Sequence, residues 1–197
     1  MRQRGVQVVL LLTFVRLWNS SGWRPFIPIY LREAGFDNTL ISSVLAANSV
    51  VSTFTALWAS WLARRSSNEV ATALALGLGA IGTAMSPWLV WVPAVYLPAL
   101  FIGTGVGVSL PLLMASVSSE VSPDQRGVAL GMRMSMNQAA SAVAPVSVGA
   151  VAEPFGIPVA LLASGVFSMG VLGISMVLYG SRATRRAPLD TAEAERW

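Results

Sequence analysis

The sequence predicts an all-α membrane protein with about six transmembrane helices. Hydrophobic residues make up 54% of the 197 residues, and charged residues make up only 11%. The mean hydropathy is +0.64, well outside the usual balance of a soluble domain. The charged residues gather in short stretches, and the apolar runs between them are long enough for spanning helices, each of which needs roughly 20 residues.

Charged and turn residues divide the chain into six spans. Pro93, Pro123 and Pro158 each stand where a helix would begin, a position in which the missing N–H of proline costs nothing. We therefore expect a six-helix bundle over residues 1–181 and a polar tail over residues 182–197. The expected spans are about 6–31, 38–63, 69–86, 93–117, 123–152 and 157–180.

Polar residues before three of these spans are candidate helix caps. Asp37 or Asn38 is expected to cap the second span, and Asn68 the third. Ser122 and Gln125 have the spacing of a capping box at the start of the fifth span.

The arginines predict the orientation of the bundle. All thirteen basic residues are arginine. If the N-terminus is cytoplasmic, only Arg32 is outside, and Arg16, Arg24 and Arg133 lie within spans. The other nine are inside: Arg2, Arg4, Arg64, Arg65, Arg126, Arg182, Arg185, Arg186 and Arg196. Cytoplasmic loops carry the excess of basic residues, so both termini of this multi-pass protein are expected on the cytoplasmic side of a bacterial-type inner (plasma) membrane.

The composition excludes several classes of chemistry. The sequence has no cysteine, histidine or lysine, so it lacks a thiolate nucleophile, the usual zinc ligands, a Walker A lysine and a Schiff-base lysine. No enzyme activity, catalytic residue, metal or cofactor is predicted. Because the arginines follow the membrane topology, no nucleic-acid partner is predicted either.

Two arginines fall inside the apolar spans and are the main candidates for function. Arg16 lies ten residues after Val6, about 15 Å into a core of roughly 30 Å. A central arginine costs about 2.5–3.5 kcal/mol, so it is expected to face a watery cavity or a partner. Arg133 is only seven residues from Arg126 and could extend to the inner surface instead. Arg24, close to the outer face, is expected to be an interface anchor.

Polar side chains recur at helical spacing on three spans. Such stripes line an aqueous path or act as hydrogen-bonding contacts between helices, and arginine and asparagine favour the path. The stripes are Thr13, Arg16, Ser20 and Trp23; Asn48, Ser52 and Thr55; and Arg133, Asn137 and Ser141.

Aromatic and glycine residues are expected to have membrane and packing roles. Gly103 and Gly107 have the small-xxx-small spacing that lets membrane helices approach closely. Aromatic residues near the ends of spans are expected to form interfacial belts: Trp23, Tyr30, Trp88, Trp91 and Tyr96 outside, with Trp58 and Trp61 inside.

The segment Pro123-Asp124-Gln125-Arg126-Gly127-Val128-Ala129-Leu130-Gly131 resembles the Pro-x-x-Arg-Gly-x-Ala-x-Gly pattern of major facilitator superfamily transporters. In that family, this segment is a cytoplasmic loop that leads into a cavity-lining helix, which implies a conformational role for Pro123, Arg126, Gly127 and Gly131. In another motif loop of the family, Ser60 and Arg64 stand here in place of glycine and aspartate, a change more common in the second half of the fold.

This resemblance implies one half, the C-terminal half, of a twelve-helix secondary transporter that moves a small organic solute by alternating access. Arg16, Asn48, Arg133 and Asn137 are the expected path-lining residues. The expected partners are the solute, the lipid bilayer, and an N-terminal six-helix half or a second copy of the chain. Efflux is one of the directions left open, and a non-transporting six-helix scaffold or remnant is the alternative function. The two arginines suit an anionic solute or acids in the companion half.

Overall fold

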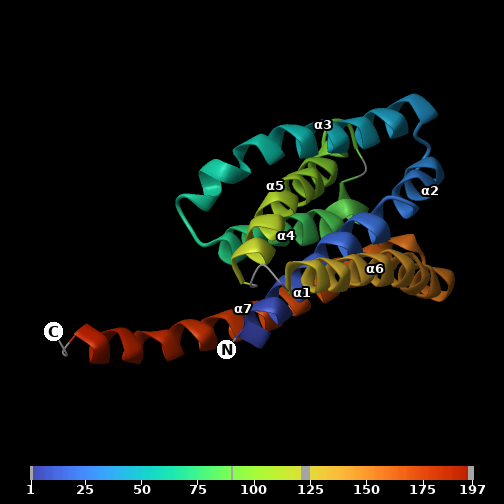
Figure 1. Ribbon diagram of the computed structural model, residues 1–197. Helices are drawn as coiled ribbons and strands as arrows, with labels where there is room; N and C mark the ends of the chain where they lie inside the picture. The colour runs from blue at the N-terminus through green and yellow to red at the C-terminus, as the bar shows by residue number, and fades with distance from the viewer. Residues whose placement is uncertain (1, 90, 121–124, 195–197) are drawn as a thin grey trace.

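The computed structural model describes residues 2–89, 91–120 and 125–194, and this part of the chain is helical without a strand (Figure 1). The helices follow one another with short connections, as expected for a membrane bundle. They are α1 (Arg2–Trp23), α2 (Phe26–Glu33), α3 (Asn38–Ala63), α4 (Asn68–Met85), the short 3₁₀ helix η1 (Ser86–Trp88), α5 (Tyr96–Glu120), α6 (Arg126–Phe155) and α7 (Ile157–Ala194).

The first expected span, 6–31, is divided between α1 and α2. The break falls at Arg24 and Pro25, because proline has no N–H to continue the hydrogen-bond ladder and restricts the residue before it. After α2, Gly35 adopts a φ of +90°, and its N–H donates to the Arg32 carbonyl at 3.0 Å. Glycine takes this left-handed conformation without the strain that a side chain would add.

Side-chain caps fix the starts of the next two helices. Asp37, one of the two expected caps, accepts a hydrogen bond from the Leu40 N–H at 3.2 Å. The cap of α4 is Ser67 and not the expected Asn68, because the Ser67 hydroxyl accepts from the Val70 N–H at 3.4 Å. In both cases, the side-chain oxygen satisfies an N–H that has no partner within the helix.

Helix α5 is held between α3 and α4 by glycines on opposite sides. A Cβ atom at Gly103 would lie 2.6 Å from the Asn48 carbonyl oxygen of α3, and one at Gly107 would collide with the Ser52 carbonyl oxygen. On the other side, a Cβ at Gly105 would lie 2.7 Å from the Ala75 oxygen of α4. The expected packing role of Gly103 and Gly107 is confirmed, because hydrogen alone allows these backbones to come so close.

The helices pack as a curved row in the order α3, α5, α4, α7, α1 and α6. Helix α1 also contacts α5 and α4, so the row curves back on itself and α1 packs against its middle. Helix α3 packs chiefly on α5, whereas α6 packs on α1 and α7. In the described part of the chain, α3 and α6 therefore stand at opposite ends of the row, on either side of α1 and α5 (Figure 1).

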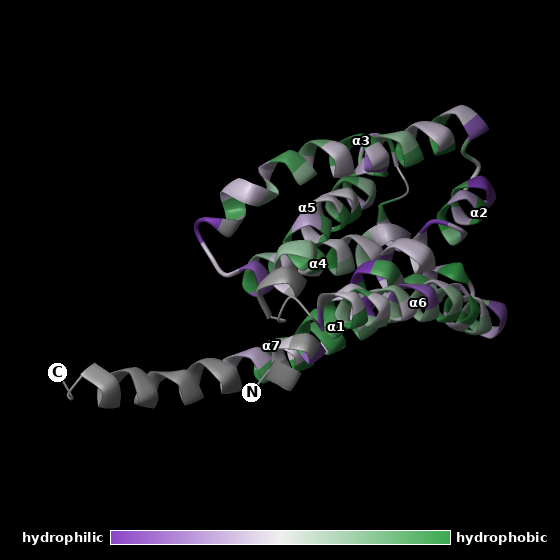
Figure 2. Cartoon of the chain, viewed as in Figure 1, coloured by the Kyte–Doolittle hydropathy of each residue, from purple (hydrophilic) through white to green (hydrophobic). Residues whose placement is uncertain are grey.

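Apolar side chains cover the outside of the bundle as well as its core. Strongly hydrophilic residues lie mostly near helix ends (Figure 2). Large apolar side chains such as Leu57, Val146 and Val177 are at least 70% exposed, more than is usual for a protein surface in water. Four of the described helices are long and apolar enough to cross a membrane: 38–62, 68–88, 96–116 and 157–180.

The expected count of six spans is thus supported for four helices. The two long helices that fall short are α1 and α6, and these two carry Arg16 and Arg133. Their polar stripes lower the mean hydropathy. Both helices are nevertheless long, with 22 and 30 residues, which at 1.5 Å per residue is enough to span the hydrocarbon core.

One expected member of the outer aromatic belt belongs to the core. Trp23 has no exposed surface, and its Nε1 donates to the Ser86 hydroxyl at 3.0 Å. By contrast, Trp58 and Trp88 are more than 60% exposed, as a belt requires. The expected belt role of Trp23 is wrong, because a position near a helix end does not show whether the side chain faces the core of the bundle or its outside.

Helix α6 begins later than the expected fifth span, and α7 extends beyond the sixth, whose apolar stretch has the expected bounds 157–180. Helix α6 begins at Arg126, with Gln125 as its N-cap but without a side-chain cap hydrogen bond. The other half of the expected capping box, Ser122, lies outside the described residues, as does Pro123. Helix α7 continues past Gly180 to Ala194.

Candidate functional site

Arg133 is the most deeply buried charged residue among those whose side chains the structure describes. It lies two turns into α6, and only 3% of its surface is exposed. Its Nη1 donates to the thioether sulfur of Met114 on α5 at 3.4 Å, which is a weak acceptor. Its Nε and Nη2 have no hydrogen-bond partner. A buried guanidinium with two unused donors is costly unless something else binds them.

Arg16 lies on α1, the helix against which α6 and its Arg133 pack, and the two positive charges repel each other. Arg16 is half-buried, and its Nε also lacks a partner. In sequence it stands between Val15, part of one core cluster, and Trp23, part of another. Along α1, Arg16 therefore lies between the two core clusters.

Two neutral side chains add unsatisfied polar atoms beside this pair. Asn137 lies one turn after Arg133 on α6, and its Oδ1 is buried without a partner. Thr13 lies one turn before Arg16 on α1, and its hydroxyl is likewise buried and unpaired. Residues three or four apart share a helix face. These four residues form what we call the arginine cluster: Thr13, Arg16, Arg133 and Asn137.

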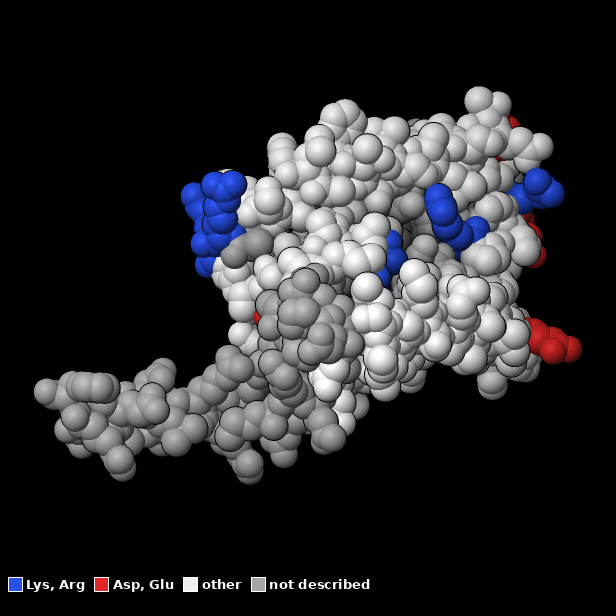
Figure 3. Space-filling model, viewed as in Figure 1, with Lys and Arg blue, Asp and Glu red and all other residues white. Residues whose placement is uncertain are grey.

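Arginine atoms are visible on the face of the bundle that lies between α3 and α6. Figure 3 shows some of them in a hollow at the middle of this face and others toward the two ends of the molecule, while the visible acidic atoms lie toward the ends. We call this the open face. Of the acidic residues with described side chains, Glu33, Asp37, Glu69 and Glu153 all lie at helix ends, so none is placed to neutralise the cluster.

On another side of α1, the polar side chains of Trp18 and Asn19 are paired with neighbouring helices. Asn19 donates to the Leu76 carbonyl of α4 at 3.4 Å and accepts from the Ser168 hydroxyl of α7 at 2.6 Å. Trp18 donates from Nε1 to the Ser164 hydroxyl of α7 at 3.0 Å. Hydrogen bonds of this kind connect membrane helices.

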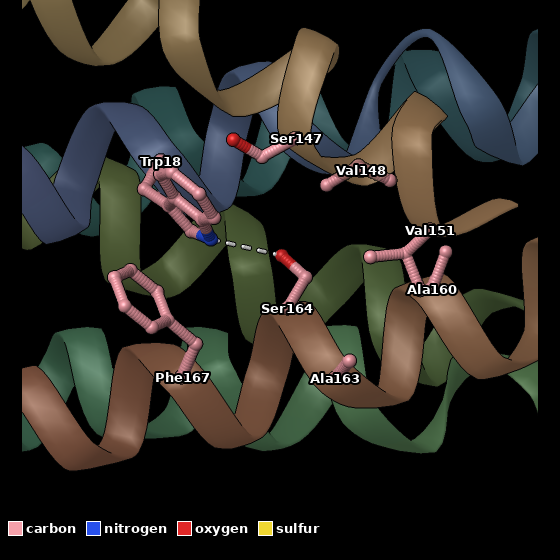
Figure 4. Close-up of a pocket in the computed structure, with 8 residues that line it drawn as sticks. All are labelled: Trp18, Ser147, Val148, Val151, Ala160, Ala163, Ser164 and Phe167. Atoms are coloured by element: carbon pink, nitrogen blue, oxygen red, sulfur yellow. Dashed lines mark hydrogen bonds between the residues drawn. The ribbon is translucent and has the colours of Figure 1, made fainter.

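Trp18 also lines a small cavity between α1, α6 and α7, with a volume of about 230 Å³ (Figure 4). Its walls carry no charge, and Ser164 is already bound to Trp18 (Figure 4). Phe167 stacks near the indole ring at a centroid distance of 4.6 Å. This cavity therefore offers packing space and little to orient a polar solute.

The fourth expected path residue, Asn48, lies apart from the arginine cluster. It is buried between α3 and α5, and its Nδ2 donates to the Ala99 carbonyl at 2.9 Å. Arg24, the expected interface anchor, is exposed and donates to the Ser49 hydroxyl at 3.1 Å. The structure thus brings together three of the four expected path residues, Arg16, Arg133 and Asn137, and it occupies Asn48 with a contact between helices.

The described glycines of the expected loop motif, Gly127 and Gly131, lie in the first two turns of α6. A Cβ atom at either position would meet nothing within 4 Å. These glycines are therefore not required for packing within the bundle. Arg126 begins the helix.

Helices α4 and α7 form a different kind of surface on the outside of the bundle. A groove of about 580 Å³ runs between them and is lined only by apolar residues and glycines, among them Leu74, Leu78 and Met176. Leu74 is 66% exposed. An apolar groove on membrane-spanning helices suits contact with lipid.

Some residues of the site had no signal in the sequence. Met114 of α5 contacts Arg133, but a methionine in an apolar helix is an ordinary core or lipid-facing residue. Asn19 and Ser168, which join α1 to α7, were likewise not singled out, because their spacing within each helix says nothing about the neighbouring helix. Thr13 was part of the predicted stripe.

Together, these features define a multi-pass membrane protein whose helical bundle contains arginine nitrogens without hydrogen-bond partners. The model of the Major Facilitator Superfamily matches residues 9–196, which is nearly the whole chain. The chain therefore belongs to the Major Facilitator Superfamily, whose members are secondary transporters that sit in lipid and bind small solutes. No curated protein matches the sequence.

Proposed function

We propose that this chain forms one six-helix half, the C-terminal half, of an alternating-access transporter for a small organic solute. The observation that carries the proposal is the buried Arg133 together with the half-buried Arg16. Three of their buried donors, Nε and Nη2 of Arg133 and Nε of Arg16, have no acceptor within the described part of the chain. Charged groups inside a membrane bundle mark substrate or ion pathways. The open face, with Arg16, Arg133 and Asn137 beneath it, would line the solute path.

The exposure of α3 supports a companion bundle on the open face. Only 17% of the apolar window of α3 is buried, against 56% for α4 and for α5, and α3 stands at one end of the row of helices. A second six-helix bundle, either an N-terminal half or a second copy of this chain, would cover α3 and α6 and enclose the path. The segment from Pro123 to Gly131 would act in the conformational change.

The distribution of arginines supports the orientation that we propose, with both termini on the cytoplasmic side of a bacterial-type inner membrane. Arg64 and Arg65 are exposed in the turn after α3, and Arg65 lies over the Trp61 ring at 4.3 Å. An arginine stacked on an exposed tryptophan at a helix end suits a membrane interface.

The proposal is tested in the cells that make the protein, after removal of the native gene. The wild type and the Arg16→Gln, Arg133→Gln and Arg24→Gln variants are returned at equal levels, and the solutes inside and outside the cells are profiled. We expect at least one solute to change its distribution with the wild type and with Arg24→Gln, but not with the other two variants. The Arg24 variant is the matched control, since Arg24 is exposed and already bound to Ser49.

A non-transporting scaffold would give the opposite result. In that case, all four proteins would leave the solute profile equal to that of cells without the gene, and the transporter proposal would fail.

The companion is identified by crosslinking. The sequence contains no cysteine, so Phe54→Cys would place the only thiol on the exposed side of α3, where Phe54 is 65% exposed. A product in native membranes at twice the 20.8 kDa of the chain identifies a second copy. A product of another mass identifies a separate half, and an absence of any crosslinked product contradicts a companion on this face.

A further inference from the structure

We propose that the transported solute is a small anion, bearing a carboxylate or phosphate group that binds between Arg16 and Arg133. This inference rests on the proposed transport function and names its substrate class. It starts from an imbalance of charge. One guanidinium group lies on α1 and the other on α6, two helices that pack against each other, and neither makes an ion pair with a residue that the structure describes.

The unused donors of Arg133 have the geometry that binds an anion. Nε and Nη2 are neighbouring nitrogens on one edge of the guanidinium, and both are free, whereas Nη1 points to Met114. Two parallel N–H groups on one edge form the fork that binds two oxygens of a carboxylate or phosphate. The free Nε of Arg16 adds a third donor from the other helix.

Burial makes a bound anion favourable at this position. Arg133 is 97% buried, since 3% of its surface is exposed, and like charges repel strongly where water is scarce. A carboxylate or phosphate between the two arginines would replace this repulsion with two attractions. A neutral or cationic solute would leave both charges uncompensated.

Asn137 gives the site a second type of contact. Its Oδ1 is an unused acceptor one turn along α6 from Arg133, so it would bind a hydroxyl or N–H group carried by the same solute. Figure 3 shows a hollow with arginine atoms on the open face, and this is the side from which the solute would reach the site.

Binding is measured on the purified 197-residue chain in lipid nanodiscs, where it is independent of transport. The probes are benzoate, inorganic phosphate and the neutral analogue benzamide, at constant ionic strength, and the readout is the thermal unfolding midpoint as a function of probe concentration. We expect benzoate or phosphate to stabilise the wild type in a saturable way and benzamide to have no effect. Arg133→Gln or Arg16→Gln should lower the affinity for the anion at least about tenfold. Arg24→Gln should bind the anion with the same affinity as the wild type.

Arg133→Lys separates charge from geometry. Lysine keeps the positive charge but loses the fork, so this variant is expected to bind the anion more weakly than the wild type and more tightly than Arg133→Gln. It also serves as the control if Arg133→Gln does not fold.

The inference is overturned if neither anion stabilises the wild type more than benzamide does, or if the anions stabilise the glutamine variants equally. If the first result is found, and the cell experiment shows arginine-dependent transport of a neutral or cationic solute, the transport function stands. The arginines would then form ion pairs with acidic residues of the companion bundle. If an anion binds saturably but no solute changes its distribution in cells, the proposed anion site stands and the proposed transport function fails.

Discussion

Two sides of α1 carry polar side chains into the interior of the bundle, but only one side satisfies them. Toward α4 and α7, Trp18 and Asn19 have partners for every polar side-chain atom. On the side of Thr13 and Arg16, the buried atoms have none. Buried polar groups in proteins are nearly always paired. We therefore interpret the paired side of α1 as a contact between helices and the unpaired side as the binding surface for the proposed solute.

The largest effect is expected from Arg16→Leu, which should separate function from stability. Removing one partner of a buried charged contact costs about 2–5 kcal/mol of binding, so solute flux should fall about 30-fold or more. The free energy of unfolding should stay the same or rise, because an uncompensated buried charge has been replaced by an apolar group. Flux assays and denaturant titration in detergent measure the two quantities. A loss of stability above about 2 kcal/mol would show that Arg16 is a structural contact.

Asn19→Leu should lower stability and leave solute binding unchanged. It removes the bonds to Leu76 and Ser168 and leaves the Ser168 hydroxyl buried without a partner, so we expect a loss of about 2 kcal/mol in the free energy of unfolding. Solute affinity in the folded fraction should be unchanged. The same denaturant titration measures the loss, and an unchanged midpoint would mean that the paired side of α1 contributes nothing to stability.

Water should reach the unsatisfied side and not the lipid-facing surface. In the cysteine-free background, Asn137→Cys should react with a water-soluble maleimide at least about tenfold faster than Val166→Cys, although Val166 is 57% exposed on α7. Labelling rates in native membranes give the comparison. Equal rates at the two positions would argue against an aqueous path at the arginine cluster.

The smallest effect is expected from Trp18→Phe. Phenylalanine keeps an aromatic ring beside Phe167, which lies 4.6 Å from the indole centroid, but loses the hydrogen bond to Ser164. We expect a loss of about 1 kcal/mol in the free energy of unfolding. A double-mutant cycle with Ser164→Ala tests the pairing: additive losses would contradict a direct bond of that strength.

The sequence predicted the elements well because a membrane span is a long apolar run between charged stretches. The expected span 38–63 has the bounds of α3. The expected count of six spans is supported for four helices only. Helices α1 and α6 carry stripes of polar residues, and they therefore fall short of the apolarity that α4 and α5 reach.

The sequence predicted the individual residues of the candidate site, but it did not predict which of them lie together. Arg16 and Arg133 stood out as charges within spans, but nothing in their spacing showed that they meet. The stripe containing Asn48 looked the same as the stripe containing Asn137. Only the positions of neighbouring helices distinguish a side chain bound to the Ala99 carbonyl from one with a free oxygen.

The glycines of α5 also restrict how the bundle can adapt to change. Gly103 and Gly107 touch the backbone of α3, while Gly105 touches that of α4 from the opposite side. A helix that is crowded on one side can usually move away, but α5 is enclosed on both sides, so relief of one clash creates another. The spacing of α3, α5 and α4 is thus set by the single hydrogen atoms of these glycines, so any larger residue at one of the three positions would have to move two helices at once.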